Sequence, residues 1–413
     1  MFIRQIHVSH NKTHMDIRSI TIFSNWDALP DNTADFLAAG RAAFPYPVQS
    51  TRAAFPPFPD WLPLANLNAA ISNLQSQLPT LGLNYASLGP VQLDHDPAWL
   101  AAIPRILSQS DALFVTAEIA DGNGRISPTR CHQIARLIQQ ISTLQANGFG
   151  NLYFAALANC PPGSPFFPVA YHDGGAPGFA LAIEAADLAQ AAIAASRTLA
   201  DARANLVAAI ETAAAAISAP AAELAAQYGL VYRGLDFSLA PYPTADKSLA
   251  GALEALGLPH LGAHGSLFAA GFVTEAIGRA RFPRCGFSGL MLPVLEDSIL
   301  AQRAGDGLIT VQDLLSYAAV CGVGLDTVPL PGDVSAASLA GILLDVAMLA
   351  TRLGKPLTAR LMPLPGLAAG DAVQFDFPYF APSRVMAVSG AGVTGLMADG
   401  ERPSLLDIHK INR

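Results

Sequence analysis

Three charged residues interrupt apolar runs of this sequence and could bind or convert a ligand. Asp236 lies in RGLDFSLAP, Asp326 follows the glycines of CGVGLD, and Arg360 lies in LTARLMPL. A buried charge needs a partner of opposite charge. A guanidinium can bind a carboxylate or a phosphate through two parallel hydrogen bonds. Ligands of α/β folds collect at the carboxyl ends of strands. We therefore expect Arg360 to bind an anion near Asp236. The alternative roles are loop bracing for both aspartates and a structural counter-ion for Arg360.

A second group is rich in glycine, histidine and serine. His264 and Gly265 lie in GAHGS, where the glycines allow close approach of a ligand, so we expect His264 to transfer protons. His172, in YHDGG, is a ligand-binding candidate or a turn residue. Ser288 and Gly289, in GFSGL, are further ligand-binding candidates. That segment lacks a complete G-x-S-x-G nucleophile elbow, so no serine hydrolase is assigned.

Glu296 and Asp297 follow GLMLPVL, and with Asp326 they could hold a divalent cation, since magnesium, calcium and manganese prefer oxygen ligands. The alternative is that Glu296 and Asp297 begin a helix, where the macrodipole favours acidic residues. Cys321 is a candidate nucleophile, although a buried small hydrophobe is the simpler interpretation. The cofactor is otherwise unknown.

The elements that must position these residues alternate between apolar runs and helix-period segments, which is typical of an α/β sheet with parallel strands. We predict helices at 129–146, 247–256, 311–320 and 335–353, and a long helix over 186–228 that is kinked or restarted near Pro220. Predicted strands cover 17–23, 112–119, 151–158, 179–185, 230–240, 286–294, 324–330, 357–364, 372–377 and 383–389.

Two stretches fall outside this alternation. Residues 1–15 are expected to form a tail, and 16–413 a single domain. Within it, a proline- and aromatic-rich stretch at 40–66 is expected to be a surface loop, because proline removes ladder donors. The alternative for this loop is a lid or a subunit contact.

Composition excludes several classes of protein. The net charge is −8 with no long basic run, which argues against nucleic-acid binding. The apolar stretches 203–228 and 335–353 contain acidic residues (Glu211, Glu223 and Asp345), so neither is expected to span a membrane. No secretory signal is evident and the four cysteines are far apart, so we expect a cytoplasmic protein with reduced thiols.

Several blocks together resemble the domain-of-unknown-function 711 family: GLDFSLAPYPTADKSLAGALEALGL (234–258), GAHGS (262–266), GFSGLMLPVLED (286–297) and CGVGLD (321–326). The resemblance implies a single large domain forming a ten-stranded α/β barrel of the pyruvate formate-lyase-like type, and no established reaction. Glycyl-radical enzymes of that fold carry an Arg-Val-x-Gly segment near the C-terminus. Here Arg384-Val385-Met386-Ala387 has alanine in place of the glycine, so we expect no radical chemistry.

Our leading hypothesis is an enzyme that acts on a small anionic metabolite by acid–base or metal-assisted chemistry. Arg360 would bind the anion, His264 would transfer protons and Asp236 would orient it. The alternative is a non-catalytic small-ligand-binding protein or an oligomeric scaffold. We expect a homo-oligomer in either case.

Overall fold

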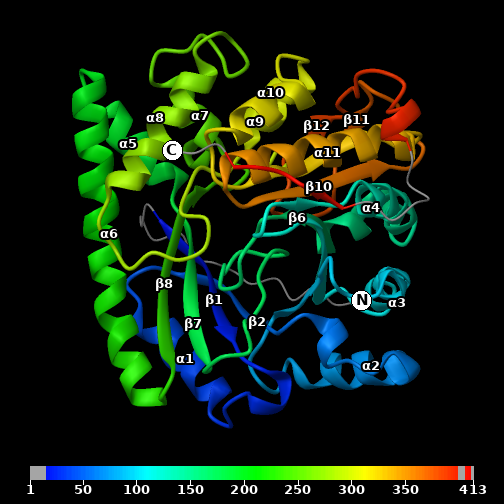
Figure 1. The fold of residues 1–413 in the computed structure, drawn as a ribbon. Helices are drawn as coiled ribbons and strands as arrows, with labels where there is room; N and C mark the ends of the chain where they lie inside the picture. Colours follow the sequence, from blue (N-terminus) through cyan, green and yellow to red (C-terminus); the bar gives the residue numbers. More distant parts are fainter. Residues whose placement is uncertain (1–14, 399–404, 411–413) are drawn as a thin grey trace.

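The computed structural model describes residues 15–398 and 405–410 of the chain; the expected tail at 1–15 lies outside them except for Met15. The protein is a mixed α/β domain built on one large sheet, with the helices around the outside of the sheet (Figure 1). The strands of this sheet are β1 (Asp16–Phe23), β2 (Val48–Ala54), β3 (Tyr85–Val91), β4 (Leu113–Ala120), β5 (Arg125–Ile126), β6 (Phe154–Ala158), β7 (Gly178–Glu184), β8 (Val231–Ala240), β9 (Gly324–Pro331), β10 (Leu357–Leu364) and β13 (Leu406–Asp407). A separate hairpin pairs β11 (Ala372–Val373) with β12 (Ser383–Arg384).

The strand order is β8-β7-β1-β2-β3-β4-β6-β10-β9, and the strands run in two directions. β1, β2, β3, β4 and β6 are parallel to one another. β7 and β8 are parallel to each other and antiparallel to β1, and β9 and β10 are related in the same way to β6. No hydrogen-bonded ladder joins β8 to β9 within the described residues, so the barrel expected from the resemblance is not closed by strand pairing.

The segment between α8 (Ser266–Arg279) and α9 (Ser298–Gly305) lies in that gap. It makes one parallel bridge to β8 (Leu235 with Arg284) and one to β9 (Pro293 with Asp326). The predicted strand at 286–294 is therefore wrong as a ladder strand, although the segment touches both edges of the sheet. The backbone of this segment packs directly on the backbone just before β9, where Gly289 faces Gly322. A Cβ added to Gly289 would lie 2.6 Å from the Cα of Gly322, so only glycine allows this approach.

The α-helices are α1 (Thr33–Ala43), α2 (Leu67–Gln77), α3 (Ala102–Leu107), α4 (Pro128–Ser142), α5 (Ala186–Ala194), α6 (Leu199–Tyr228), α7 (Leu249–Glu254), α8 (Ser266–Arg279), α9 (Ser298–Gly305), α10 (Val311–Ala318) and α11 (Ala336–Leu353). Short 3-10 helices lie at η1 (Trp26–Ala28), η2 (Phe58–Asp60), η3 (Leu64–Asn66), η4 (Pro97–Ala101), η5 (Ala146–Tyr153), η6 (Ala245–Lys247) and η7 (Gly395–Met397). The four separately predicted helices are confirmed, with ends shifted by a few residues. The alanine-rich region is helical, but it breaks before Thr198, whose side chain caps α6 by accepting from Asp201 N.

Of the two predicted effects of Pro220, a restart does not occur, because α6 continues unbroken through it from Leu199 to Tyr228. Ile217, Ala221 and Leu224 are all buried on one face of α6 around the proline. This packing compensates for the one helical hydrogen bond that proline removes.

The stretch at 40–66 is not a surface loop throughout, because it contains β2 in the middle of the sheet. Its prolines flank the strand instead of interrupting it: Pro47 directly precedes Val48, and Pro56 comes two residues after Ala54. β3 was also missed, since it contains Gly89 and Pro90; its pairing with β4 shifts register between Ser87 and Pro90, which accommodates the proline. The predicted strands at 372–377 and 383–389 shrink to the two-residue strands β11 and β12.

Two helices, α6 and α11, are long and apolar enough to cross a membrane when judged by length and composition, which the sequence analysis did not expect. The same composition is typical of helices that pack on a core. α11 contacts α4, β10 and β4, and α6 contacts α5, α8 and β8.

Candidate functional site

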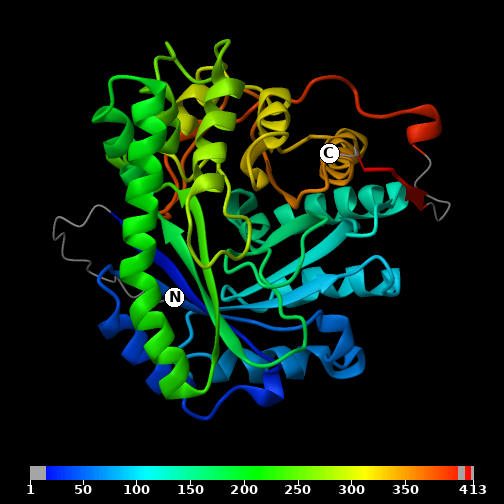
Figure 2. The same cartoon turned by 60° about the vertical axis from the view of Figure 1, so that its left-hand side comes forward.

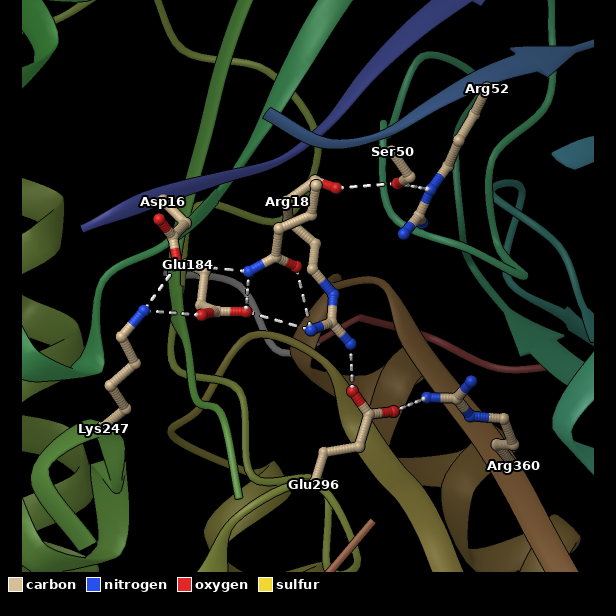
Figure 3. A network of polar contacts seen from close by, with 9 residues as sticks. Asp16, Arg18, Ser50, Arg52, Glu184, Lys247, Glu296 and Arg360 are labelled. Carbon is tan, nitrogen blue, oxygen red and sulfur yellow. Dashed lines mark hydrogen bonds and ion pairs between the residues drawn. The ribbon is translucent and has the colours of Figure 1, made fainter. Parts of the chain in front are cut away.

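A continuous chain of ion pairs crosses the interior of the protein, from η6 to β9. Every contact in it joins side chains that are at most one-fifth exposed. Figure 3 shows most of this network, with Glu296 between Arg18 and Arg360. In order, the pairs are Lys247–Asp16 (2.5 Å), Lys247–Glu184 (3.2 Å), Arg18–Glu184 (3.0 Å), Arg18–Glu296 (2.6 Å), Arg360–Glu296 (2.7 Å) and Arg360–Asp326 (2.5 Å).

The shared carboxylate of Glu296 shows that the sheet is strongly curled. Arg18 lies on β1 and Arg360 on β10, and five strand pairings separate these strands in the sheet. Neighbouring strands are about 4.8 Å apart, so a flat sheet would place the two backbones about 24 Å from each other. Both guanidinium groups nevertheless bind Glu296, at 2.6 and 2.7 Å. The interior face must therefore bend back on itself around this residue.

The carboxylates keep the two arginines of the network charged. Burial alone would lower the pKa of Arg18, but Glu296 and Glu184 raise it above its usual value. Burial acts in the same way on Arg360, and there Asp326 and Glu296 raise the pKa. All of these donors and acceptors are engaged with one another, so the network by itself leaves no guanidinium free for a ligand.

Arg52, on β2, is an arginine outside the ion-pair network, and its guanidinium is only partly hydrogen-bonded. Its Nε donates to Ser50 Oγ at 2.9 Å, while its Nη1 and Nη2 donate to no acceptor in the described part of the chain. The guanidinium carbon lies 5.0 Å from the ring centre of Phe167 and 6.0 Å from that of Tyr85. Burial, and then the charge of Arg18, lower the pKa of Arg52 to about 10, so it is a cation at neutral pH.

Three of the residues proposed from the sequence do meet: Arg360, Asp326 and Glu296. Arg360 binds two carboxylates of the protein, which is the structural counter-ion role given above as its alternative. Glu296 and Asp326 share this arginine, while Asp297 points elsewhere, so the three carboxylates do not form the expected cation site. Within residues 15–398 and 405–410, no group of three or more His, Cys, Asp or Glu side chains is placed to hold a metal ion.

A separate group of hydrogen-bonded residues contains Asp236, Ser288 and Gly289, and its bonds are made to other protein groups. The buried carboxylate of Asp236 accepts from Phe287 N (2.7 Å), Ser288 N (2.8 Å) and Ser238 Oγ (2.5 Å). Burial raises the pKa of Asp236 to about 6, although these hydrogen bonds oppose the shift. Ser288 Oγ donates to backbone carbonyls. This arrangement braces the segment that fills the gap between β8 and β9.

The remaining candidates do not join the network. His264 and Gly265 are exposed in the turn before α8, and no hydrogen bond or ion pair joins His264 to another described residue. His172 is buried, its Nε2 lies 3.1 Å from Gly175 O, and burial lowers its pKa, which fits a neutral turn residue. Cys321 is buried in the core. Of the sequence-predicted candidates, the structure therefore brings Arg360 together with Asp326, while the side chain of Asp236 bonds to a different set of described residues.

Sequence reasoning missed Arg18, Arg52, Glu184 and Lys247. Arg18 and Arg52 did carry a signal, since each is a lone base inside a short run with strand propensity (DIRSITIF and VQSTRAA). Glu184 closes the predicted strand at 179–185 in the same manner. Their partnership follows from long-range pairing, such as that of Asp16 with Glu184, which local patterns do not encode.

Comparison with known proteins places the chain in a family. A profile described as "Uncharacterised ACR (DUF711)" matches residues 10–376. The chain belongs to this family. Proteins named "UPF0210 protein" are similar to it: one from Pyrobaculum arsenaticum is 40% identical over 53% of this chain and 50% of its own length, and one from Methanopyrus kandleri is 30% identical over 75% and 70%. The chain spans between half and about two-thirds of the length of the first such relatives.

The DUF711 match includes the whole ion-pair network and Arg52, since these residues lie between Asp16 and Arg360. It ends before Tyr379, whose ring lies 4.7 Å from the guanidinium carbon of Arg18. Neither the family description nor the names of these relatives specify a reaction.

Glu118, near the end of β4, is a buried acid outside the ion-pair network, and its titration tests how strongly the interior shifts the pKa of a carboxyl group. Burial raises its pKa to about 7; Leu93 N and Arg130 oppose this, and Asp121 and Asp94 add to it. An acid whose pKa is raised on folding holds extra protons in the folded state, so its contribution to stability falls as pH rises between about 4.3 and 7. Glu118→Gln does not titrate and keeps an acceptor for Leu93 N. We expect the wild type to lose stability relative to this variant by as much as about 1.4 kcal/mol per pH unit across that window, measured by urea unfolding. A constant difference would show that Glu118 titrates normally.

Proposed function

We propose that the protein binds a small anionic metabolite, through a carboxylate or phosphate group, at the guanidinium of Arg52. The observation that carries this proposal is a half-buried cation with two unused donor nitrogens. A desolvated charge is costly without a partner, and Arg is the residue best suited to pair with planar or tetrahedral oxyanions.

The surroundings of Arg52 support an anion over a neutral ligand. The nearby carboxylate of Glu296 already binds Arg18 and Arg360 through its two oxygens. The charge of Arg18 lowers the pKa of Arg52, and Glu296 opposes that shift only weakly, so the network does not neutralise the Arg52 cation. An incoming anion would accept from Nη1 and Nη2, which donate to no acceptor within residues 15–398 and 405–410.

Acid–base catalysis on that anion is the enzymatic form of this proposal. Tyr85 is the strand partner of Arg52 on β3, with its ring centre 6.0 Å from the guanidinium carbon. Burial raises the pKa of its phenol, so it would be a neutral proton donor beside the ligand. His264, the donor expected from the sequence, is too exposed and too isolated from this region to be assigned that role. Turnover would distinguish the enzyme from the rival ligand-binding protein.

Arg52→Met gives a two-sided test. Removing an unpaired cation and keeping an apolar chain against Phe167 should leave the free protein as stable as the wild type or more so. The wild type should be stabilised by phosphate, sulfate or citrate, with a gain of about 2.7 kcal/mol when the anion reaches roughly 100 times its Kd, and the variant should not. Thermal unfolding at constant ionic strength, adjusted with sodium chloride, measures both effects.

Arg105→Gln is the matched control, because Arg105 is an exposed arginine bonded to Asn68. It should respond to each anion as the wild type does, and so should His264→Ala. Equal anion stabilisation in wild type and Arg52→Met would reject the site.

We also propose that the curled sheet is a barrel in which residues 284–294 occupy the place of a tenth strand. Its single bridges to β8 and β9 are both parallel, matching the common direction of β7, β8, β9 and β10. This supports the pyruvate formate-lyase-like type implied by the resemblance. A cytoplasmic location, and the absence of nucleic-acid and membrane partners, remain proposals that rest on composition.

A further inference from the structure

An apolar hollow of about 720 Å³ lies between the start of α6 and α8, remote from the ion-pair network. A second hollow of about 370 Å³ continues along the same two helices. Figures 1 and 2 both place α6 at the periphery of the molecule. The first hollow is lined by Leu199, Ala200, Arg203, Leu267, Phe268, Gly271, Phe272, Glu275 and Val320.

Large apolar side chains stand exposed on this face. Phe268 is 62% exposed, Leu267 46% and Leu199 45%. Phe268 stacks only loosely on Phe272, with ring centres 6.1 Å apart. A protruding aromatic ring therefore stands directly beside an apolar hollow, which is costly in water and marks an interaction surface.

The hollow depends on a glycine in the middle of α8. A Cβ added at Gly271 would make ordinary contacts of 3.7 to 3.8 Å with Val320, so nothing in the fold requires glycine at this position. Its effect is to leave space one turn along from Phe268. α6 is itself largely uncovered, because only 33% of its most apolar window is buried.

The charges around the two hollows are mixed and balanced. Arg203 lies 3.9 Å from Glu275, Arg279 pairs with Glu275 as well, and Glu211 completes two acids and two bases. Such a rim does not favour a strongly charged partner such as a nucleic acid or an acidic membrane. With two acids and two bases it carries no net charge, so the same rim on a second copy would not repel it.

We propose that this face is a twofold interface between two copies of the chain. A twofold axis presents the same patch on both subunits, so it needs a protrusion and a matching hollow on one surface. Phe268 and the space beside Gly271 are that pair, and each Phe268 fills the hollow of the other copy. This places the contact of the expected homo-oligomer on α6 and α8 instead of the 40–66 stretch.

Two substitutions test the interface from opposite sides. Phe268→Glu removes the protrusion and Gly271→Leu fills the hollow; neither residue is buried in the core of the single chain. Sedimentation velocity should show a dimer for the wild type, with the dimer Kd raised roughly 30-fold or more by each variant. Thermal unfolding checks that each variant folds, and loss of the dimer in either folded variant suffices.

Met348→Gln is the control, since Met348 is 42% exposed on α11, outside the hollows, and should leave the dimer unchanged. A wild type that sediments as a monomer at its highest soluble concentration would overturn the proposal. So would a dimer that survives both variants. Binding of the wild-type monomer to phosphatidylcholine vesicles, lost in Phe268→Glu, would overturn it in favour of a lipid surface.

Discussion

Glu296→Gln is expected to destabilise the protein by about 3–5 kcal/mol, because it breaks a buried ion pair on both sides at once. The side chain is 10% exposed and each of its oxygens binds a different guanidinium. The amide keeps the shape but turns an NH₂ group toward one arginine and removes the charge that both require. Urea unfolding at neutral pH measures the loss, with the slope of the transition reporting whether the unfolding remains two-state.

Asp94→Asn is the matched control for this substitution. Asp94 also pairs with an arginine, through two hydrogen bonds to Arg125, but its side chain is 75% exposed. Surface pairs of this kind contribute at most about 1 kcal/mol. A Glu296→Gln effect as small as that of Asp94→Asn would mean that the interior pairs are solvated and that the central network is not structural.

The network also separates stability from the proposed binding. Glu296 holds Arg18 and Arg360, whereas Arg52 has no direct share in it. Arg52→Met should therefore affect anion binding without loss of stability, and Glu296→Gln should do mainly the reverse. A network that itself bound the anion would show both effects in Glu296→Gln.

Local patterns predicted the strands whose apolar runs are buried on both faces. β4, β7, β9 and β10 lie within a residue or two of the predicted ranges. β2 was not predicted, because its polar, arginine-containing sequence lies between prolines. Its place in the sheet comes from pairing with β1 and β3. The sequence signal for such a strand is weak, since tertiary pairing decides it.

The candidate site likewise contains residues that local sequence patterns identify and residues that only the tertiary structure identifies. Arg360, Asp326 and Glu296 were found because each follows or interrupts an obvious apolar run, and chain direction brings those runs together. His264 was misplaced because flanking glycines are as typical of an exposed helix start as of a ligand loop; Gly265 has a φ of 104° at the N-cap of α8. Arg52 could not be ranked from sequence. What distinguishes it is that its Nη1 and Nη2 meet no acceptor among the described residues, which is a three-dimensional property.

Asp297 is expected to stabilise the protein as a helix cap instead of a metal ligand. Asp297→Ala should lower the free energy of unfolding by about 3 kcal/mol, which is roughly the contribution of two helix caps and the burial of their hydrogen bonds. Its fully buried carboxylate accepts from Ile299 N and Leu300 N of α9, and from Leu249 N and Ala250 N of α7. Ser248, the N-cap of α7, also donates to it at 2.5 Å. One side chain therefore caps two helices.

The measurement pairs urea unfolding with hydrogen exchange, and exchange should speed up in the first turns of α7 and α9 together. Ser335→Ala is the control, because Ser335 caps only α11 and should cost about 1 kcal/mol. Ser248→Ala combined with Asp297→Ala should cost less than the sum of the single changes, since the two side chains bond to each other. Additive costs, or faster exchange in α9 alone, would show that the two helices are capped independently and that Asp297 does not couple them.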